Sequence, residues 1–267
     1  MIGTGGFASG PLLYVAAKRK IPTVIQEQNS FPGITNKILA PKVNKICVAY
    51  EQMDRFFPAH KIMLTGNPIR ETVKKINPDR AFAHSTFNLD PSKQTLLVLG
   101  GSLGARRINE LIAQNLDELL GQGINILWQT GKLYFDKLNE EFGGRQNENF
   151  RLMPFIKNMD DAYAMDIIIS RAGAGTISEL AVAAKATLLI PSPNVAEDHQ
   201  TKNATALVRK NAALLFRESE TNEMFLKAVS DLKEQKAKLE ENITKFAMPH
   251  AAAEIAEEVL KLVKANA

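Results

Sequence analysis

Residues 96–105 read LLVLGGSLGA, an apolar run that ends abruptly in a glycine-rich turn. An amphipathic helical pattern follows at once, with apolar residues at Ile108, Leu111 and Ile112. A buried strand, a glycine turn and a helix N-terminus together form an anion site, because free backbone N–H groups and the helix dipole point at one place. The alternative is a strand-to-helix turn without a ligand, and this stretch alone does not decide between the two.

The residues around this turn narrow the choice of ligand. Arg106 and Arg107 fall in the first turn of the expected helix, where cations are disfavoured, and an anionic ligand would offset that cost. The glycine spacing matches neither a P-loop nor the strict dinucleotide fingerprint G-x-G-x-x-G. No acidic residue follows the turn at a suitable place to hold a nicotinamide ribose, which disfavours a dehydrogenase.

The composition indicates a globular protein with one large or two modest domains. The chain has 267 residues, of which 45% are hydrophobic and 23% are charged. A net charge of +4 mildly favours anionic partners such as nucleotides, diphosphates or an acidic membrane surface. A single cysteine, Cys47, excludes an internal disulfide framework. No apolar run is long enough to predict a membrane span.

Strand and helix patterns alternate regularly from residue 94 onward. Six apolar strand candidates lie at residues 96–99, 124–128, 150–153, 167–170, 187–190 and 213–216. Such alternation predicts an α/β fold with a doubly wound parallel sheet, in which all strand carboxyl ends meet at one edge. Upstream, shorter strand candidates lie at 23–25, 45–48 and 62–64, with a helix expected at 34–39.

Several loops at strand ends carry polar or glycine-rich residues. Residues 171–175 read RAGAG and lead into Thr176 and Glu179, whose spacing matches a helix capping box. The functional alternative for Glu179 is a carboxylate that accepts hydrogen bonds from both hydroxyls of a ribose. A second glycine-rich turn at 3–10 precedes a helix that ends in three basic residues at 18–20, which are either solvated or in contact with anionic lipid.

Taken together, these loops resemble the membrane-associated UDP-N-acetylglucosamine transferases of peptidoglycan synthesis, the MurG family. The matching stretches span nearly the whole chain in the family's order: GTGGFASGP at 3–11, EQNSFPGITNK at 27–37, GNPIR at 66–70, LGGSLGARRIN at 99–109, PFI at 154–156, SRAGAGTISEL at 170–180 and DHQTKNA at 198–204. The resemblance implies a GT-B fold, in which two Rossmann-like domains face a cleft.

The resemblance also implies domain limits. Residues 1–72 would be the remnant of a truncated acceptor and membrane-side domain, 73–93 a linker, 94–248 a complete UDP-sugar-binding domain, and 249–267 a helix that docks back toward the first domain. The family carries an earlier glycine loop that ends in a histidine, and Met1 and Ile2 leave no room for a preceding strand. The chain is therefore expected to lack roughly the first quarter of such an enzyme. Gln26 stands where some members have histidine.

The implied site residues fall into three groups. The loop with Ser102 would hold a diphosphate, Ile156 would meet uracil through its backbone, and Glu179 would bind the ribose. The full set of substrate-binding positions is Asn29, Arg70, Ser102, Ile156, Ala174, Gly175, Thr176, Ile177, Ser178, Glu179 and Gln200. The acceptor diphosphate would meet Gly3, Thr4, Gly5, Gly6 and Ser9. Glu27 is the local candidate for a general base, and the family's own candidate lies in the earlier segment.

The implied activity is an inverting transfer of N-acetylglucosamine from UDP-N-acetylglucosamine to lipid I, which yields lipid II. The implied partners are the nucleotide sugar, lipid I and anionic lipid at the cytoplasmic face of the plasma membrane, with no nucleic acid, cofactor or metal. Two alternatives stay open: a fragment that binds UDP-N-acetylglucosamine without turnover, and an enzyme similar to UDP-N-acetylglucosamine 2-epimerase.

Overall fold

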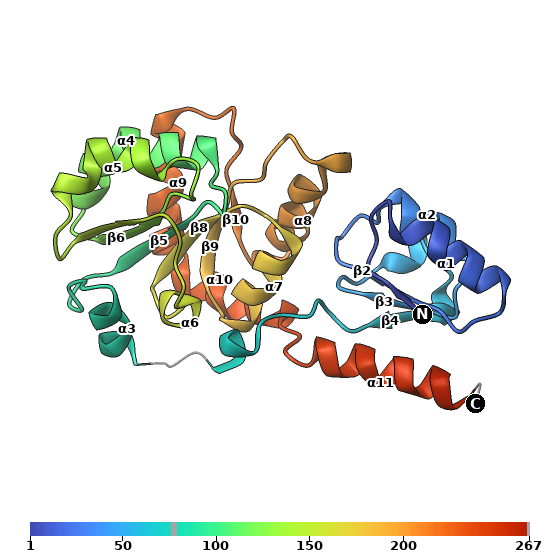
Figure 1. The fold of residues 1–267 in the computed structure, drawn as a ribbon. Helices are drawn as coiled ribbons and strands as arrows, with labels where there is room; N and C mark the ends of the chain where they lie inside the picture. Colours follow the sequence, from blue (N-terminus) through green and yellow to red (C-terminus); the bar gives the residue numbers. More distant parts are fainter. Residues whose placement is uncertain (76–78, 266–267) are drawn as a thin grey trace.

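The computed structural model describes residues 1–75 and 79–265, which form two parallel sheets flanked by helices (Figure 1). The first sheet has the strand order β1-β2-β3-β4, and the second has the order β10-β9-β8-β5-β6-β7. Every pair of neighbouring strands in both sheets is parallel. The α/β class and the doubly wound arrangement of the second half are thus confirmed.

The first sheet is short and lies in the N-terminal part of the chain. Its strands are β1 (Ile2–Gly3), β2 (Val24–Glu27), β3 (Lys45–Val48) and β4 (Ile62–Leu64), and its helices are α1 (Ser9–Lys18) and α2 (Ile34–Leu39). Two 3₁₀ turns follow at Met53–Arg55 and Ala59–Lys61. The expected strands 45–48 and 62–64 and the helix 34–39 are confirmed. Helix α1 begins before Pro11, which a first helical turn tolerates because its missing N–H is not needed there.

The second sheet carries the six strands expected from the sequence. They are β5 (Thr95–Leu99), β6 (Asn125–Gln129), β7 (Phe150–Met153), β8 (Ile167–Ser170), β9 (Ala186–Leu189) and β10 (Leu214–Leu215). Every residue of β5, β6, β8 and β9 is buried, since helices cover both faces of the sheet. This double coverage explains why these strands read as continuous apolar runs rather than alternating ones.

Helices and 3₁₀ turns complete the second half. They are Glu71–Lys75, α3 (Arg80–Thr86), α4 (Arg106–Gly121), α5 (Phe135–Phe142), Gly143–Arg145, α6 (Met159–Ala162), α7 (Ala174–Val182), Ala196–Asp198, α8 (His199–Val208), α9 (Asn222–Glu234), α10 (Lys236–Ile243), Thr244–Phe246 and α11 (Ala251–Lys264). Helices α4 and α9 pack with Leu96 and Val98 on one face of β5. Helices α7 and α8 pack with Leu97 and Leu99 on the other face.

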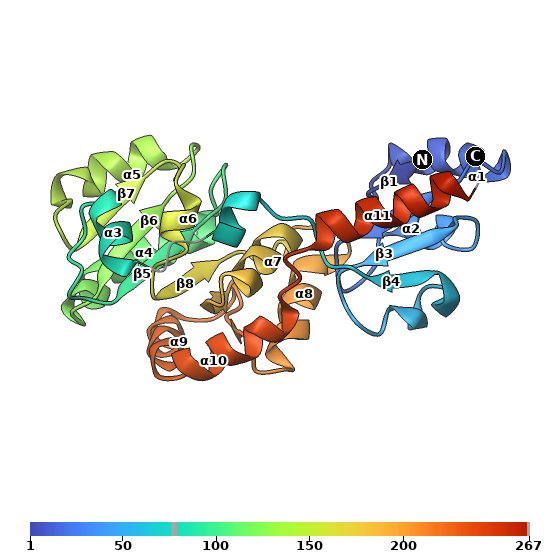
Figure 2. The ribbon, with the colours of Figure 1, turned by 90° about the horizontal axis from the view of Figure 1, so that it is seen from below.

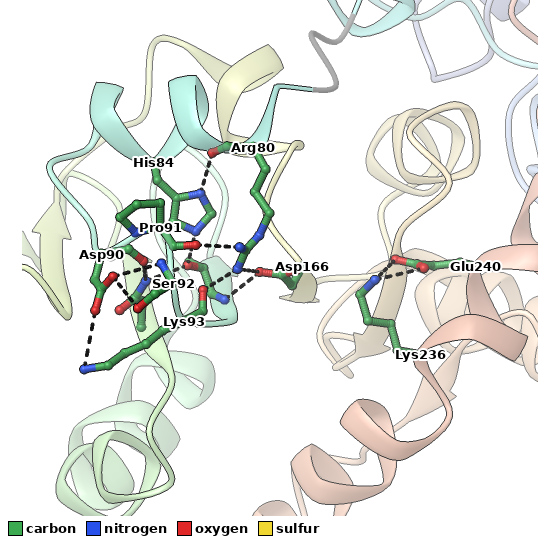
Figure 3. Close-up of polar contacts among 11 residues, drawn as sticks. Arg80, His84, Asp90, Pro91, Ser92, Lys93, Asp166, Lys236 and Glu240 are labelled. Atoms are coloured by element: carbon green, nitrogen blue, oxygen red, sulfur yellow. Dashed lines mark hydrogen bonds and ion pairs between the residues drawn. The ribbon is translucent and has the colours of Figure 1, made fainter.

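Helix α3 lies inside the segment expected to be a linker, and a polar cluster anchors it (Figure 3). Arg80 donates through Nη1 to the carbonyl of Pro91 at 2.6 Å and through Nη2 to Asp166 Oδ2 at 3.0 Å. Asp166 Oδ2 also accepts from the backbone N–H of Thr95 at 2.8 Å. The buried His84 contacts Thr95 Oγ1 through Nε2 at 2.8 Å. These contacts fix α3 to the start of β5.

Helix α11 runs back along the first sheet (Figure 2). Ile255 forms one apolar cluster with Val24 and Cys47 of that sheet. The spacing of Ile255, Val259, Leu260 and Val263 in the sequence predicts one apolar face for this helix, but Leu260 and Val263 are 58% and 55% exposed, so the prediction is wrong for these two residues. The buried residues are Ala251, Ile255 and Glu258, and the Glu258 carboxylate accepts a hydrogen bond from Lys261 at 2.8 Å. Across the described residues, no helix combines the length and apolar character needed to cross a membrane.

Candidate functional site

A cleft lies at the carboxyl ends of β5, β6 and β8, at the edge of the second sheet where ligands of open α/β folds bind. We call it the edge cleft. It is lined by Arg70, Leu99, Gly101, Ser102, Gln129, Phe155, Met159, Tyr163, Ser170, Arg171, Thr176 and Glu179. Four of the residues expected to bind substrate therefore meet here, namely Arg70, Ser102, Thr176 and Glu179. Arg70 comes from the segment after β4, so both halves of the chain contribute to the cleft.

The glycine turn at 100–105 adopts the conformation that its sequence requires. Gly101 and Gly104 have positive φ angles of 80° and 97°. A Cβ on Gly104 would lie 2.4 Å from the carbonyl oxygen of Thr130, so no larger residue fits. Helix α4 begins directly after the turn, and its N-cap residue, Ala105, makes no side-chain capping bond. The first N–H groups of the helix therefore receive no side-chain acceptor from its N-cap.

The two arginines at the start of α4 are held by other parts of the protein. Arg106 donates to Glu110 at 2.7 Å, and Arg107 donates to the carbonyls of Glu218 and Glu220, each at 3.0 Å. An anionic ligand is therefore not required to offset their charge, in contrast to the expectation from the sequence. An anion bound at this turn would depend on backbone N–H groups rather than on these guanidinium groups.

Glu179 does not form the capping box that its spacing suggested. Helix α7 begins at Ala174 with Gly173 as its N-cap, so Thr176 and Glu179 both lie inside the helix. The carboxylate instead receives a bidentate contact from Arg70: Nε lies 2.7 Å from Oε1, and Nη2 lies 2.6 Å from Oε2. The hydroxyl of Tyr163 donates to Oε2 at 2.9 Å. The capping-box interpretation of Glu179 is therefore wrong, and the carboxylate faces the edge cleft.

The polar groups around Glu179 keep well-defined protonation states. Burial is the main cause that raises the pKa of Tyr163 far above its usual value, and the neighbouring Glu179 raises it further. The pKa of Arg70 is also raised, chiefly by its hydrogen bond to Glu179. Arg70 therefore stays a cation and Tyr163 stays a neutral donor throughout the physiological range.

Gln129 joins two loops of the edge cleft, and sequence reasoning missed it. Its Nε2 donates to the carbonyl of Gly101 at 3.1 Å, and its Oε1 accepts from the backbone N–H of Ile156 at 2.9 Å. Ile156 is fully buried, whereas Phe155 is 40% exposed and lines the cleft. The sequence feature that could have revealed Gln129 is a polar residue at the carboxyl end of an otherwise apolar strand.

A second pocket lies beside the glycine turn of the first sheet, and we call it the glycine-loop pocket. It is lined by Thr4, Gly5, Gly6, Phe7, Glu27, Gln28, Asn29, Phe31, Gly33, Ile34, Thr35, Asn36, Ala196, Glu197 and His199. It thus brings together Thr4, Gly5 and Gly6 with Asn29. The other half of the chain contributes residues 196–199.

Glu27 is 3% exposed, and both of its carboxylate oxygens are engaged. Oε1 accepts from the N–H of Asn29 at 3.0 Å, and Oε2 accepts from the N–H of Gly33 at 3.1 Å and from Asn36 Nδ2 at 2.8 Å. These bonds fix the loop between β2 and α2. The catalytic role expected of Glu27 stays a prediction, and its contacts favour a structural role.

Amide side chains connect the two halves of the molecule. Asn203 on α8 is fully buried, donates to Asn29 Oδ1 at 3.0 Å and accepts from the N–H of Ser30 at 2.9 Å. Asn67 donates to Ser178 Oγ at 3.1 Å, and its Oδ1 accepts from Gln26 at 2.7 Å. Neither Asn67 nor Asn203 was expected as a site residue.

The remaining expected residues lie outside the linings of these two pockets. Gln200 Oε1 accepts from the N–H of Ser192 at 2.9 Å and so holds the loop after β9. Ile177 is 3% exposed and packs in the core. Ser9 donates to the carbonyl of Gly5 at 2.8 Å and so shapes the first glycine turn. The others in this group are Gly3, Ile156, Ala174, Gly175 and Ser178.

Comparison with known proteins agrees with this arrangement. The C-terminal domain model of glycosyltransferase family 28 matches residues 95–259, and the N-terminal domain model of that family matches residues 1–48. The two sheets and the edge cleft therefore belong to a family 28 glycosyltransferase with the GT-B fold.

The most informative relatives share one name, UDP-N-acetylglucosamine--N-acetylmuramyl-(pentapeptide) pyrophosphoryl-undecaprenol N-acetylglucosamine transferase. The protein from Flavobacterium psychrophilum is 52% identical over 270 residues, which cover all of this chain and 73% of that protein. The protein from Bacteroides thetaiotaomicron is 48% identical, over 99% of this chain and 73% of its own length. The chain belongs to this family of transferases, which confirms the resemblance seen in its loops.

Solved structures agree on the fold. Acinetobacter baumannii MurG is 26% identical with a TM-score of 0.77, and the match covers 97% of this chain and 72% of that one. The UDP-GlcNAc 2-epimerase from Neisseria meningitidis is 13% identical with a TM-score of 0.65, and the match covers 97% of this chain and 76% of that one. At that identity, the second likeness shows the fold alone.

Proposed function

We propose that this chain transfers N-acetylglucosamine from UDP-N-acetylglucosamine to the 4-hydroxyl of undecaprenyl-diphosphate-linked N-acetylmuramoyl-pentapeptide. The observation that carries the proposal is the edge cleft, where Arg70, Ser102, Thr176 and Glu179 converge beside the N-terminus of α4. Membership in the transferase family supplies the substrate class. The carboxylate of Glu179 in the cleft and the nearby N-terminus of α4 support this assignment.

The donor nucleotide fits the edge cleft by its chemistry. The diphosphate is placed at the turn before α4, where N–H groups and the helix dipole favour negative charge. We assign the ribose hydroxyls to Glu179 and the uracil to the backbone at Ile156, whose own N–H donates to Gln129 Oε1 at 2.9 Å. Asn29 and Gln200 are assigned to the N-acetylglucosamine, with the backbone from Ala174 to Ser178 around the nucleotide sugar.

The proposed reaction is a single inverting displacement. The acceptor oxygen forms a bond to the anomeric carbon while the bond from that carbon to the diphosphate oxygen breaks, and UDP leaves with the electron pair. Oriented N–H groups at residues 100–105 stabilise the charge that develops on the diphosphate. The acceptor hydroxyl must give up its proton to a general base.

The acceptor diphosphate is placed at the first glycine turn. Gly5 and Gly6 have positive φ angles of 84° and 76°, and both line the glycine-loop pocket together with Thr4. Asn29 in the same pocket contacts Asn203 of the other half. The acceptor and the donor would therefore approach each other across the interface between the two halves.

The outer faces of α1 and α2 support contact with anionic lipid at the cytoplasmic face of the plasma membrane. These helices and the loop before α1 expose large apolar side chains, namely Phe7, Leu12, Tyr14, Val15, Ile34 and Ile38. Lys18, Arg19 and Lys20 lie at the end of α1. Apolar side chains beside cations are the pattern that binds acidic membrane surfaces.

Vesicle co-sedimentation tests this contact. Phe7→Ser, at a side chain that is 92% exposed, is expected to reduce binding to vesicles that contain phosphatidylglycerol. Leu133→Ser, at an exposed apolar residue of the other half, is the matched control. Equal binding of both variants and the parent would contradict the lipid contact.

Calorimetry with UDP-N-acetylglucosamine and a lipid I transfer assay test the proposed function together. We expect saturable binding of the nucleotide sugar and formation of a disaccharide product with release of UDP. Binding without transfer would instead favour the binding-only alternative. Release of free sugar in the absence of acceptor would favour an epimerase-like reaction, and absence of binding would contradict the donor site itself.

A further inference from the structure

Tyr163 lies at the floor of the edge cleft and has no role in the mechanism above. It follows α6 directly, is 1% exposed, and packs in the same apolar cluster as Ile177 and Leu180 of α7. Its hydroxyl is the only polar atom of the side chain, and it donates to Glu179 Oε2 at 2.9 Å. A buried phenol held in this way has little freedom to turn elsewhere.

The carboxylate of Glu179 accepts hydrogen bonds from two side chains, Arg70 and Tyr163, which differ in exposure. An ionised carboxylate has about four acceptor positions. Arg70 takes one on each oxygen and Tyr163 takes one on Oε2, which leaves about one position for a ligand. The Arg70 side chain is 48% exposed and is free to withdraw, whereas Tyr163 is enclosed by the core.

Two vicinal hydroxyls need two acceptor positions on this carboxylate. Arg70 must therefore release at least one of its bonds when a ribose binds to Glu179, and Tyr163 keeps its own. The phenol would then be the contact that fixes the rotation of the carboxylate while the ligand is present. A carboxylate with a fixed orientation distinguishes a sugar with two hydroxyls from a sugar with one more sharply than a carboxylate that can turn.

We propose that Tyr163 is a positioning residue that orients Glu179 toward the ribose hydroxyls and so sets the preference of the cleft for ribonucleoside over 2′-deoxyribonucleoside diphosphates. This inference rests on the proposed function in so far as it places a nucleotide ribose at Glu179. It adds a determinant of sugar specificity that does not touch the ligand.

The test compares the affinities of UDP and 2′-deoxy-UDP for the parent chain and for Tyr163→Phe by calorimetry. The loss of one hydrogen bond to a carboxylate predicts that the parent prefers UDP by about tenfold or more. In Tyr163→Phe, the ratio of the two affinities is expected to fall several-fold toward one, mainly because UDP binds less tightly. A general loss of folded protein affects both nucleotides equally and leaves the ratio unchanged.

Tyr50→Phe is the matched control, since Tyr50 is also a buried phenol and lies outside the edge cleft. It is expected to keep the ratio of the parent. A parent chain that binds neither nucleotide would contradict the proposed function. If Tyr163→Phe binds UDP and keeps the parent's full preference for UDP over 2′-deoxy-UDP, the role proposed for Tyr163 is wrong, while the proposed function stands. Should Tyr163→Phe fail to fold, a parent complex with UDP in which Tyr163 has turned away from Glu179 would overturn it.

Discussion

The sequence allows two interpretations of Glu179, a residue of a helix capping box or a carboxylate that binds ligand hydroxyls. Its spacing from Thr176 matched a capping box, but the helix begins at Ala174, so the capping position falls on Gly173. The carboxylate is thereby free to face the edge cleft, where Arg70 and Tyr163 contact it. The spacing alone could not reveal this, because the position of the helix start depends on the preceding strand and turn.

Glu179→Ala is expected to weaken UDP binding by about 1.5–3 kcal/mol, the usual contribution of a hydrogen bond to a charged group. Calorimetry of the folded variant measures this change. Glu240→Ala is the matched control, since Glu240 pairs with Lys236 on α10, outside the edge cleft (Figure 3). Unchanged UDP affinity in folded Glu179→Ala would remove Glu179 from the donor site.

Tyr50 provides a prediction about stability and pH. Its hydroxyl is buried without a hydrogen-bond partner among the described residues, and burial raises its pKa. Tyr50→Phe is therefore expected to raise the free energy of unfolding by about 1–3 kcal/mol, the penalty of an unsatisfied polar group. Denaturant unfolding at neutral pH measures it, and a destabilised variant would show that the hydroxyl has a partner.

The alkaline behaviour of the same variant follows from the direction of the pKa shift. Above about pH 10 an unfolded tyrosine releases its proton, whereas the buried Tyr50 retains it. The folded state then binds more protons than the unfolded state, so the free energy of unfolding falls as pH rises. Tyr50→Phe is expected to reduce this fall, and an identical slope in the parent and the variant would contradict the raised pKa.

At the scale of elements, strands were easier to predict than helix faces. Apolar runs located all six strands of the second sheet to within one residue at either end. For β5, β6, β8 and β9 the reason is that burial on both faces leaves a continuous apolar signal. Helix α11 was harder, since Glu258 lies on its buried side and Leu260 on its exposed side. The position of a charged residue whose partner lies one turn away on the same helix cannot be read from hydrophobic periodicity.

Helix α11 also carries a stability prediction. Ile255 packs against Val24 and Cys47 of the first sheet, so Ile255→Ala is expected to lower the free energy of unfolding by about 2–4 kcal/mol. Leu260→Ala, on the same helix at a residue 58% exposed, is expected to change it by less than about 0.5 kcal/mol. Thermal and denaturant unfolding compare the two. Similar losses would show that the helix buries a different face.

At the scale of the whole molecule, the site depends on how the two halves meet. Of the residues expected from the sequence to bind substrate, Arg70, Ser102, Thr176 and Glu179 meet in the edge cleft, partly because glycine turns and polar residues at the ends of parallel strands converge at one edge. It missed Asn67, Tyr163 and Asn203, which act on the expected residues through contacts between segments far apart in the chain. The contacts of Asn67 and Asn203 follow from the packing of the two halves, and that of Tyr163 follows from packing within the second half; none of them leaves a local pattern.

The substitution Asn203→Ala tests the interface between the two halves of the molecule. The variant removes the acceptor of the Ser30 N–H and the donor to Asn29 Oδ1, both at buried or partly buried positions. We expect a loss of about 1–3 kcal/mol in the free energy of unfolding for the unsatisfied groups. Asn242→Ala is the control, since it loses only exposed bonds within the second half, one to the carbonyl of Asn211 and one from Lys245 Nζ. Equal losses in the free energy of unfolding for the two variants would show that the Asn203 bonds at the interface between the halves contribute no more than an exposed bond.

The most direct measurement is the structure of this chain in complex with UDP. We predict that the diphosphate lies at the turn before α4, that the ribose hydroxyls contact Glu179, and that Arg70 has given up at least one of its bonds to that carboxylate. A complex with UDP bound elsewhere, and with the bidentate Arg70–Glu179 contact intact, would contradict the account.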